Sequence, residues 1–139
     1  MSKYSYEEKD GHPYFEKIQA ISTLRTNATT QGTVASALSF SKDYKYMLSS
    51  NAGDNSVIVY NVDEKTGMLK RNFCLPISGA YPKDVEFFPN NKFLVSLNHE
   101  SNTMTFFKLN LEEGIMTMNT KPLSISEPNC IRFYKLPVQ

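Results

Sequence analysis

The segment Phe40–Gly67 recurs as Phe87–Gly114, 47 residues further along the chain and without a gap. Where two repeated positions differ, they keep their chemical character, so the alternation of apolar and polar residues recurs together with the identities. The matched pairs include Lys45 with Lys92, Ser49 with Ser96, Asn51 with Asn98, Asn55 with Asn102, Tyr46 with Phe93, Val59 with Phe106 and Val62 with Leu109. A repeat of roughly 40 to 50 residues built from short strands is typical of a β-propeller blade, because a single blade cannot bury its own faces and must stack on neighbours.

The repeat extends beyond these two copies. Pro128–Phe133 matches Pro82–Phe87 after 46 residues, so a third copy begins near Asn129 and includes one strand. Upstream, Tyr4–Gly11 matches Tyr60–Gly67 across 56 residues, with the extra length in the connection between them. We therefore predict an all-β chain of propeller blades: a half blade over 3–24, full four-stranded blades over 34–75 and 83–123, and a closing strand over 129–134.

Within a blade, each segment has the composition of a strand or of a turn. Residues 56–62 and 103–109 are rich in the β-branched and aromatic side chains that suit a half-buried pleated surface. Ser41–Tyr44 and Pro89–Lys92 are predicted hairpin turns, because Asp and Asn tolerate positive φ and bond to their own backbone. No window has a helical period, so we expect antiparallel sheets throughout.

The composition excludes several classes of protein. With 139 residues and a formal net charge of +1, the chain lacks the basic excess that nucleic-acid binding requires. No apolar run approaches the roughly 18 residues of a membrane helix, and the N-terminus lacks the order of a secretory signal, so we predict a cytoplasmic protein with no membrane partner. Cys74 and Cys130 fall in predicted strands without metal-ligand spacing. We expect two buried thiols, no metal and no cofactor.

Five segments, taken in order and with their spacing, carry a family resemblance over nearly the whole chain. They are Glu16–Leu24, Ser50–Ser56, Tyr81–Phe87, Asn98–Thr103 and Ser126–Phe133. Together they resemble the lactonase family of seven-bladed β-propellers, which includes the propeller-type 6-phosphogluconolactonases and the carboxymuconate cyclases. The resemblance implies the C-terminal part of such a protein, with the last strand completing the ring. It also implies a hydrolase of carbohydrate metabolism that opens a sugar-phosphate lactone of the pentose phosphate pathway by water attack.

In this family the active site is thought to lie at the mouth of the central channel, where the innermost strands and the loops after the second strands converge. Opening a lactone needs a cation for the anionic substrate, a base that activates water, and a donor for the oxyanion. The resemblance implies that Lys83 is the cation and that His99 with Glu100 is the base. The substrate-binding candidates that it implies are Asn51, Asp54, Asp84, Asn98 and Arg132, with Asn51 or Asn98 as the oxyanion donor.

Each candidate also has a structural alternative. Ala52 stands where family members usually have an arginine, and residues 37–39 lack the acid and the histidine that they often carry; a neighbouring lysine replaces a guanidinium fork only in part. An exposed loop histidine, turn-capping asparagines, an ordinary strand-start pair at 83–84 and a surface arginine at 132 all remain open. The phenylalanines are expected in the core between blades.

An incomplete ring leaves apolar faces open to water, at a cost of about 25 cal/mol per Å² of unburied apolar surface. We therefore expect self-association or completion by remaining propeller blades. Two functions stay open: a lactonase-type hydrolase acting on a small-molecule sugar-phosphate lactone, and a non-catalytic propeller segment that serves binding or assembly.

Overall fold

The computed structural model describes residues 1–26, 32–134 and 136, and these residues form eleven β-strands and no helix. The predicted all-β class is confirmed. No helix of the described part is long and apolar enough to cross a membrane. The strands are β1 (Ser2–Lys9), β2 (His12–Ala20), β3 (Ala35–Phe40), β4 (Tyr46–Asn51), β5 (Ser56–Val62), β6 (Leu69–Pro76), β7 (Pro82–Phe87), β8 (Phe93–Asn98), β9 (Thr103–Asn110), β10 (Ile115–Met118) and β11 (Leu123–Ser124).

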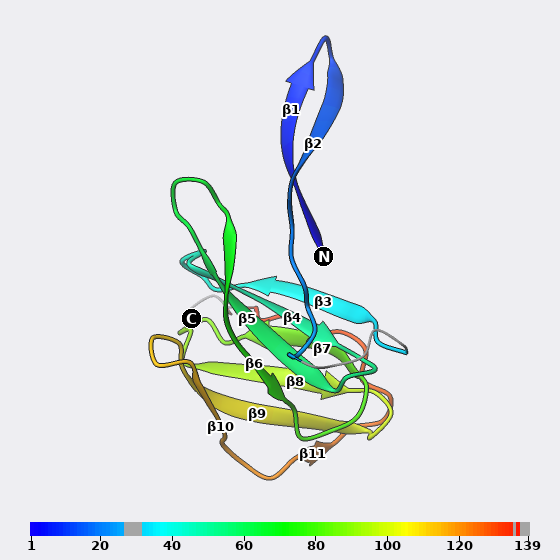
Figure 1. Cartoon of the computed structure of the whole chain (residues 1–139). Helices are drawn as coiled ribbons and strands as arrows, with labels where there is room; N and C mark the ends of the chain where they lie inside the picture. Colours follow the sequence, from blue (N-terminus) through cyan, green and yellow to red (C-terminus); the bar gives the residue numbers. More distant parts are fainter. Residues whose placement is uncertain (27–31, 135, 137–139) are drawn as a thin grey trace.

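Two antiparallel sheets stacked on one another make the body of the molecule (Figure 1). The first blade has the order β3-β4-β5-β6, and the second has the order β7-β8-β9-β10, with β11 also paired to β9. They span 35–76 and 82–124, beside the predicted ranges 34–75 and 83–123. From β3 to β6 and from β7 to β10, each strand neighbours the next one in sequence, as in a propeller blade, so β3 and β7 are the first strands of their blades.

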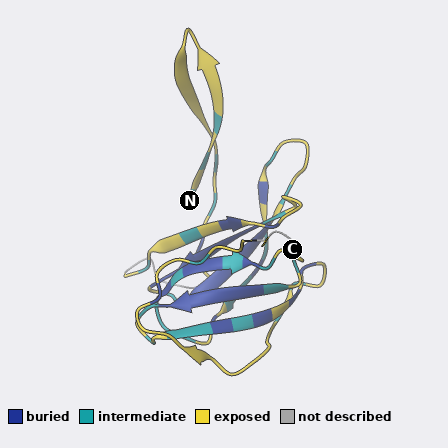
Figure 2. Ribbon diagram, turned by 180° about the vertical axis from the view of Figure 1, so that it is seen from behind, coloured by how far each residue is buried: buried dark blue, intermediate teal, exposed yellow. Residues whose placement is uncertain are grey.

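The strands β1 and β2 form a separate two-stranded hairpin that projects from the body (Figure 1). Its base is tied to the first blade through Gln19, whose side chain both donates to the carbonyl of Leu69 and accepts from its N–H, at 2.7 and 2.9 Å. Most of its residues are exposed, whereas the middle strands of the blades are buried (Figure 2).

The two blades repeat each other in their pairing. Tyr46 and Phe93 each begin a second strand, and they pair with Asn61 and Lys108, which are 47 residues apart. Tyr46 and Phe93 therefore occupy equivalent positions in the two sheets, as the repeat predicts.

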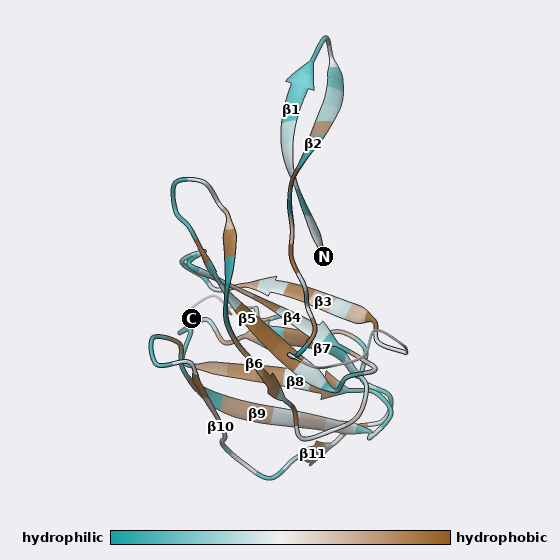
Figure 3. Ribbon diagram, in the orientation of Figure 1, coloured by the Kyte–Doolittle hydropathy of each residue, from teal (hydrophilic) through white to brown (hydrophobic). Residues whose placement is uncertain are grey.

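The main core lies between the blades, where the apolar strand centres meet (Figure 3). Its members are Leu48, Val57, Val59, Phe73 and Ile77 from the first blade and its following connection, and Val85, Phe87, Leu94, Phe107, Leu109 and Leu111 from the second. Because successive side chains in a strand point to opposite faces, Met47, Ile58 and Tyr60 lie on the other face of the first blade, where Met1 and Ile21 pack against them.

Two expectations for the C-terminal segment are wrong in the structure. Residues 129–134 form no strand, because a strand needs a hydrogen-bonded neighbour and no described strand pairs with this segment. Cys130, in the same segment, is exposed, since no sheet covers it. Cys74 in β6 is half-buried, and burial raises the pKa of its thiol.

Candidate active site

Three segments from successive repeats lie side by side and form one wall. Ser36 in β3 donates from Oγ to the carbonyl of Lys83 in β7 at 3.0 Å. On the other side of β7, the N–H of Ile131 donates to Oδ2 of Asp84, also at 3.0 Å. We call β3, β7 and residues 129–134 the inner wall.

One repeat position links all three parts of the inner wall. Ser39, Glu86 and Arg132 are separated by 47 and 46 residues. The hydroxyl of Ser39 donates to Oε1 of Glu86, while Nη1 of Arg132 lies 3.3 Å from Oε2 of the same carboxylate. The same Nη1 lies 2.8 Å from Oδ2 of Asp84, whose side chain is only 7% exposed. The wall therefore carries a serine, two carboxylates and a guanidinium in mutual contact.

Arg132 is anchored and still accessible. Its side chain is 62% exposed, and the negative charge of Asp84 raises the pKa of its guanidinium above the ordinary value. Its hydrogen bonds to described residues are all made by Nη1, so Nε and Nη2 are positioned to donate to a ligand.

Lys83 and His99 meet through Tyr81, beside the start of β7. The Nζ of Lys83 lies 5.5 Å from the centroid of the Tyr81 ring, and the imidazole centroid of His99 lies 6.4 Å from it. The N–H of His99 donates to the carbonyl of Tyr81 at 3.0 Å, which fixes the loop. The Nδ1 of His99 is buried and has no hydrogen-bond partner among the described residues. Glu100 is exposed in the adjacent turn.

The two repeat-related asparagines are buried and structural in their contacts. Asn98 accepts from Ser96 Oγ at 2.8 Å and donates from Nδ2 to Thr103 and Thr105, at 3.2 and 3.1 Å. Asn51 donates from Nδ2 to the carbonyl of Thr23, and its Oδ1 has no partner in the described part of the chain. Both side chains are fully buried, which supports the structural alternative over an oxyanion-binding role.

Asp54 is held by Arg25, a residue that the sequence did not mark. Arg25 contacts the carboxylate through Nη2 and Nε, at 2.7 and 2.9 Å, and Ser56 donates to it at 2.6 Å. The bond from Arg25 holds the pKa of Asp54 below its usual value. Ala52, in the same turn, is only 1% exposed. The turn therefore offers a carboxylate that is already paired with Arg25.

Sequence reasoning did not identify Ser39, Glu86 and Tyr81 as parts of the site. Ser39 and Glu86 could have been found from the repeat, because they share the position of Arg132 on the first strand of successive blades. A polar residue at the same position of three inner segments predicts contact across a channel wall. Among the described residues no cluster of three or more metal-binding side chains is present.

The sequence model of the family described as "Lactonase, 7-bladed beta-propeller" matches residues 1–133. The chain belongs to this lactonase family. The resemblance carried by the five segments is thereby confirmed.

The chain is similar to several lactonases over most of its own length. A 6-phosphogluconolactonase from Bacillus subtilis is 28% identical over 119 residues, which are 86% of this chain and 34% of that protein. The structure of a putative 6-phosphogluconolactonase from Bacteroides fragilis is 26% identical, with a TM-score of 0.77, over 95% of this chain and 35% of that one.

The fold has a further close neighbour. The periplasmic gluconolactonase PpgL from Pseudomonas aeruginosa superposes with a TM-score of 0.83 at 21% identity, over 96% of this chain and 37% of that one. The chain thus spans about a third of the length of the relatives that it matches.

Proposed function

We propose that the chain forms one wall of a lactonase site that opens a sugar-phosphate lactone such as 6-phosphogluconolactone. The observation that carries this proposal is the contact of Arg132 with Asp84 and Glu86 on the inner wall, with Lys83 and His99 near its edge. Support comes also from the relative in Bacillus subtilis, which is a 6-phosphogluconolactonase.

The proposed roles follow from the contacts. Lys83 and the Nε and Nη2 donors of Arg132 bind the phosphate or the developing oxyanion, while Asp84 and Glu86 orient the guanidinium. The imidazole of His99 takes a proton from water as the water oxygen bonds to the lactone carbonyl carbon. The bond from that carbon to the ring oxygen then breaks, and the ring oxygen takes up the proton from the imidazolium. Glu100, exposed in the turn beside His99, is the carboxylate proposed to act with it.

The rest of the site lies outside this wall. Because the chain spans about a third of its relatives, further groups come from remaining propeller blades or from self-association. The expected small-molecule partner is the lactone or its sugar-phosphate product, and the expected location is the cytoplasm.

The second candidate is a non-catalytic propeller segment for binding or assembly. It is favoured by Asn98 and Asp54, whose polar atoms are engaged within the chain, and by the buried Ala52. A segment with these contacts keeps the propeller fold without a complete catalytic set.

Binding of 6-phosphogluconate, followed by NMR titration, distinguishes the two. We expect the titration to shift the amides of the inner wall, and Arg132→Ala and Lys83→Ala each to weaken binding about tenfold, as for loss of one charged hydrogen bond. Lys92→Ala is the matched control, since Lys92 is an exposed lysine in the turn between β7 and β8. Absence of binding, or equal binding by all three variants, would favour the assembly module.

A further inference from the structure

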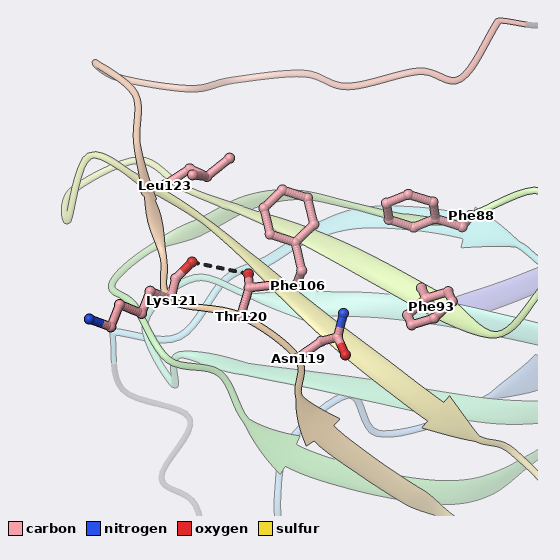
Figure 4. A pocket seen from close by; sticks show the side chains of 7 residues that line it. All are labelled: Phe88, Phe93, Phe106, Asn119, Thr120, Lys121 and Leu123. Carbon is pink, nitrogen blue, oxygen red and sulfur yellow. Dashed lines mark hydrogen bonds between the residues drawn. The ribbon is translucent and has the colours of Figure 1, made fainter.

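The second blade carries an apolar pocket of about 520 Å³ on the face turned away from the first blade (Figure 4). It is lined by Phe88, Phe93, Phe106, Leu123 and the stretch 119–121. Phe93 and Phe106 directly precede Leu94 and Phe107, which lie in the core between the blades. Successive strand residues point to opposite faces, so the pocket lies on the opposite side of the sheet.

The pocket has an exact counterpart in the repeat, and that counterpart is covered. Phe93, Phe106 and Leu123 correspond to Tyr46, Val59 and Leu75 of the first blade. Leu75 pairs with Val57 as Leu123 pairs with Met104, which confirms the last correspondence. Tyr46, Val59 and Leu75 belong to, or pack against, the core that the second blade covers. The pocket is therefore the second blade's version of a blade-to-blade contact surface.

The residues of the second blade that cover the first blade have counterparts in the hairpin β1–β2. The second blade covers it with Phe107 and Leu109 of β9 and with Met116 of β10, and Leu109 pairs with Met116. In the hairpin β1–β2, the pair at the same repeat position is Tyr6 with Phe15. Tyr4 holds the position of Phe107.

These hairpin counterparts are exposed. Tyr4, Tyr6 and Phe15 are 53%, 61% and 62% exposed, and the rings of Tyr6 and Phe15 contact each other in a tilted arrangement, with their centroids 5.5 Å apart. Glu8 and Lys17 lie on the same face of the hairpin, on either side of the Tyr6–Phe15 pair. The hairpin therefore presents an exposed aromatic face at the repeat positions that cover the first blade, and an apolar pocket is the surface that such a face covers.

We propose that the hairpin β1–β2 of one copy docks into this pocket of a second copy, as the second blade covers the first. The contact joins two different surfaces, so it is head-to-tail, and the resulting dimer keeps one free hairpin and one free pocket. Phe133 packs beside one end of the pocket, with its ring centroid 4.5 Å from that of Phe88, whereas Leu123 stays 53% exposed. This contact does not depend on lactone hydrolysis.

Sedimentation velocity over a range of concentrations tests the contact. The wild-type chain is expected to exceed the monomer mass as concentration rises. Tyr6→Glu and Leu123→Glu alter one surface each, and each is expected to raise the dissociation constant about tenfold or more, as for loss of a central aromatic or aliphatic anchor. Tyr14→Glu is the matched control, because Tyr14 neighbours Phe15 and points to the other face of the hairpin.

A mixing experiment makes the test specific to two unlike surfaces. Tyr6→Glu keeps an intact pocket and Leu123→Glu keeps an intact hairpin, so an equimolar mixture is expected to form a 1:1 dimer that grows no further. Circular dichroism checks that both variants retain their sheets. A wild-type chain that stays monomeric, a mixture that stays monomeric, or a Tyr14→Glu variant as impaired as Tyr6→Glu would each overturn the proposal.

Discussion

At the scale of single residues, buried polar side chains near the turns after the second strands hold the backbone and leave few groups for a ligand. Asn98 uses its oxygen and both amide hydrogens on Ser96, Thr103 and Thr105, and all of these partners except Thr103 are fully buried. Removing such a group leaves its partners unpaired away from water, which costs more than the bond itself contributed.

We therefore expect Asn98→Ala to destabilise the chain by about 1–3 kcal/mol, the penalty for buried unpaired partners. Urea denaturation followed by circular dichroism measures the change. Asn129→Ala removes an exposed amide and is the control, expected to stay within about 0.5 kcal/mol of wild type. Equal effects of the two substitutions would contradict the structural role of Asn98.

The Arg25–Asp54 pair predicts a pH dependence of stability. Arg25 lowers the folded-state pKa of Asp54, so the stabilisation is fully present above the unfolded pKa of about 3.9 and is lost as pH falls through the lower folded value. In Arg25→Ala we expect lower stability at neutral pH and a shallower loss of stability below that unfolded pKa. Urea midpoints at a series of pH values measure both, and parallel profiles for variant and wild type would refute the linkage.

At the scale of elements, an asparagine after the second strand of each blade holds the backbone that leads into the next repeat. Asn55 accepts from the N–H of Tyr81, and Asn102 accepts from that of Glu127, both at 2.8 Å. Both asparagines have positive φ, 49° and 52°, which this residue type tolerates better than most. These bonds hold the connection just before the proline that begins the next inner segment.

We expect Asn55→Ala to cost about 1–3 kcal/mol, since it removes a hydrogen bond and places alanine at positive φ. Asn55→Gly tolerates that conformation and should cost less. Hydrogen exchange at the amide of Tyr81 reports the lost bond directly, and both variants should accelerate it. Unchanged exchange in both would show that the connection is held by other contacts.

At the scale of the whole molecule, the chain has part of a channel wall. It also has two uncovered surfaces, which are the aromatic face of the hairpin β1–β2 and the apolar pocket of the second blade. Catalytic groups displaced by about 1 Å can lose on the order of a hundredfold in rate, and absent groups lose more. We expect the chain alone to open 6-phosphogluconolactone poorly or not at all. A coupled assay of lactone opening against the spontaneous rate measures this.

Ala52→Arg is not expected to restore activity, because one added guanidinium does not replace the groups of the site that lie outside this wall. If the chain opened the lactone well above the spontaneous rate, and Lys83→Ala or His99→Ala abolished this, the wall would be a sufficient active site. That outcome would remove the segment alternative.

The sequence alone predicted the strands of the two full blades, their antiparallel pairing and the family. These features depend on local alternation and on repetition, which are visible in the order of residues, as in the match of Tyr46 with Phe93. It also marked Arg132, Asp84, Lys83 and His99 as candidates, although it left a structural alternative for each.

The tertiary structure alone decided which candidates meet. The contacts of Arg132 with Asp84 and Glu86, and of Arg25 with Asp54, join residues far apart in the chain. They depend on how neighbouring blades stack, which no local pattern records. The same stacking covers Val59 but leaves Phe106 in an open pocket, although the two share one repeat position, because burial depends on what lies opposite a residue and not on its own side chain.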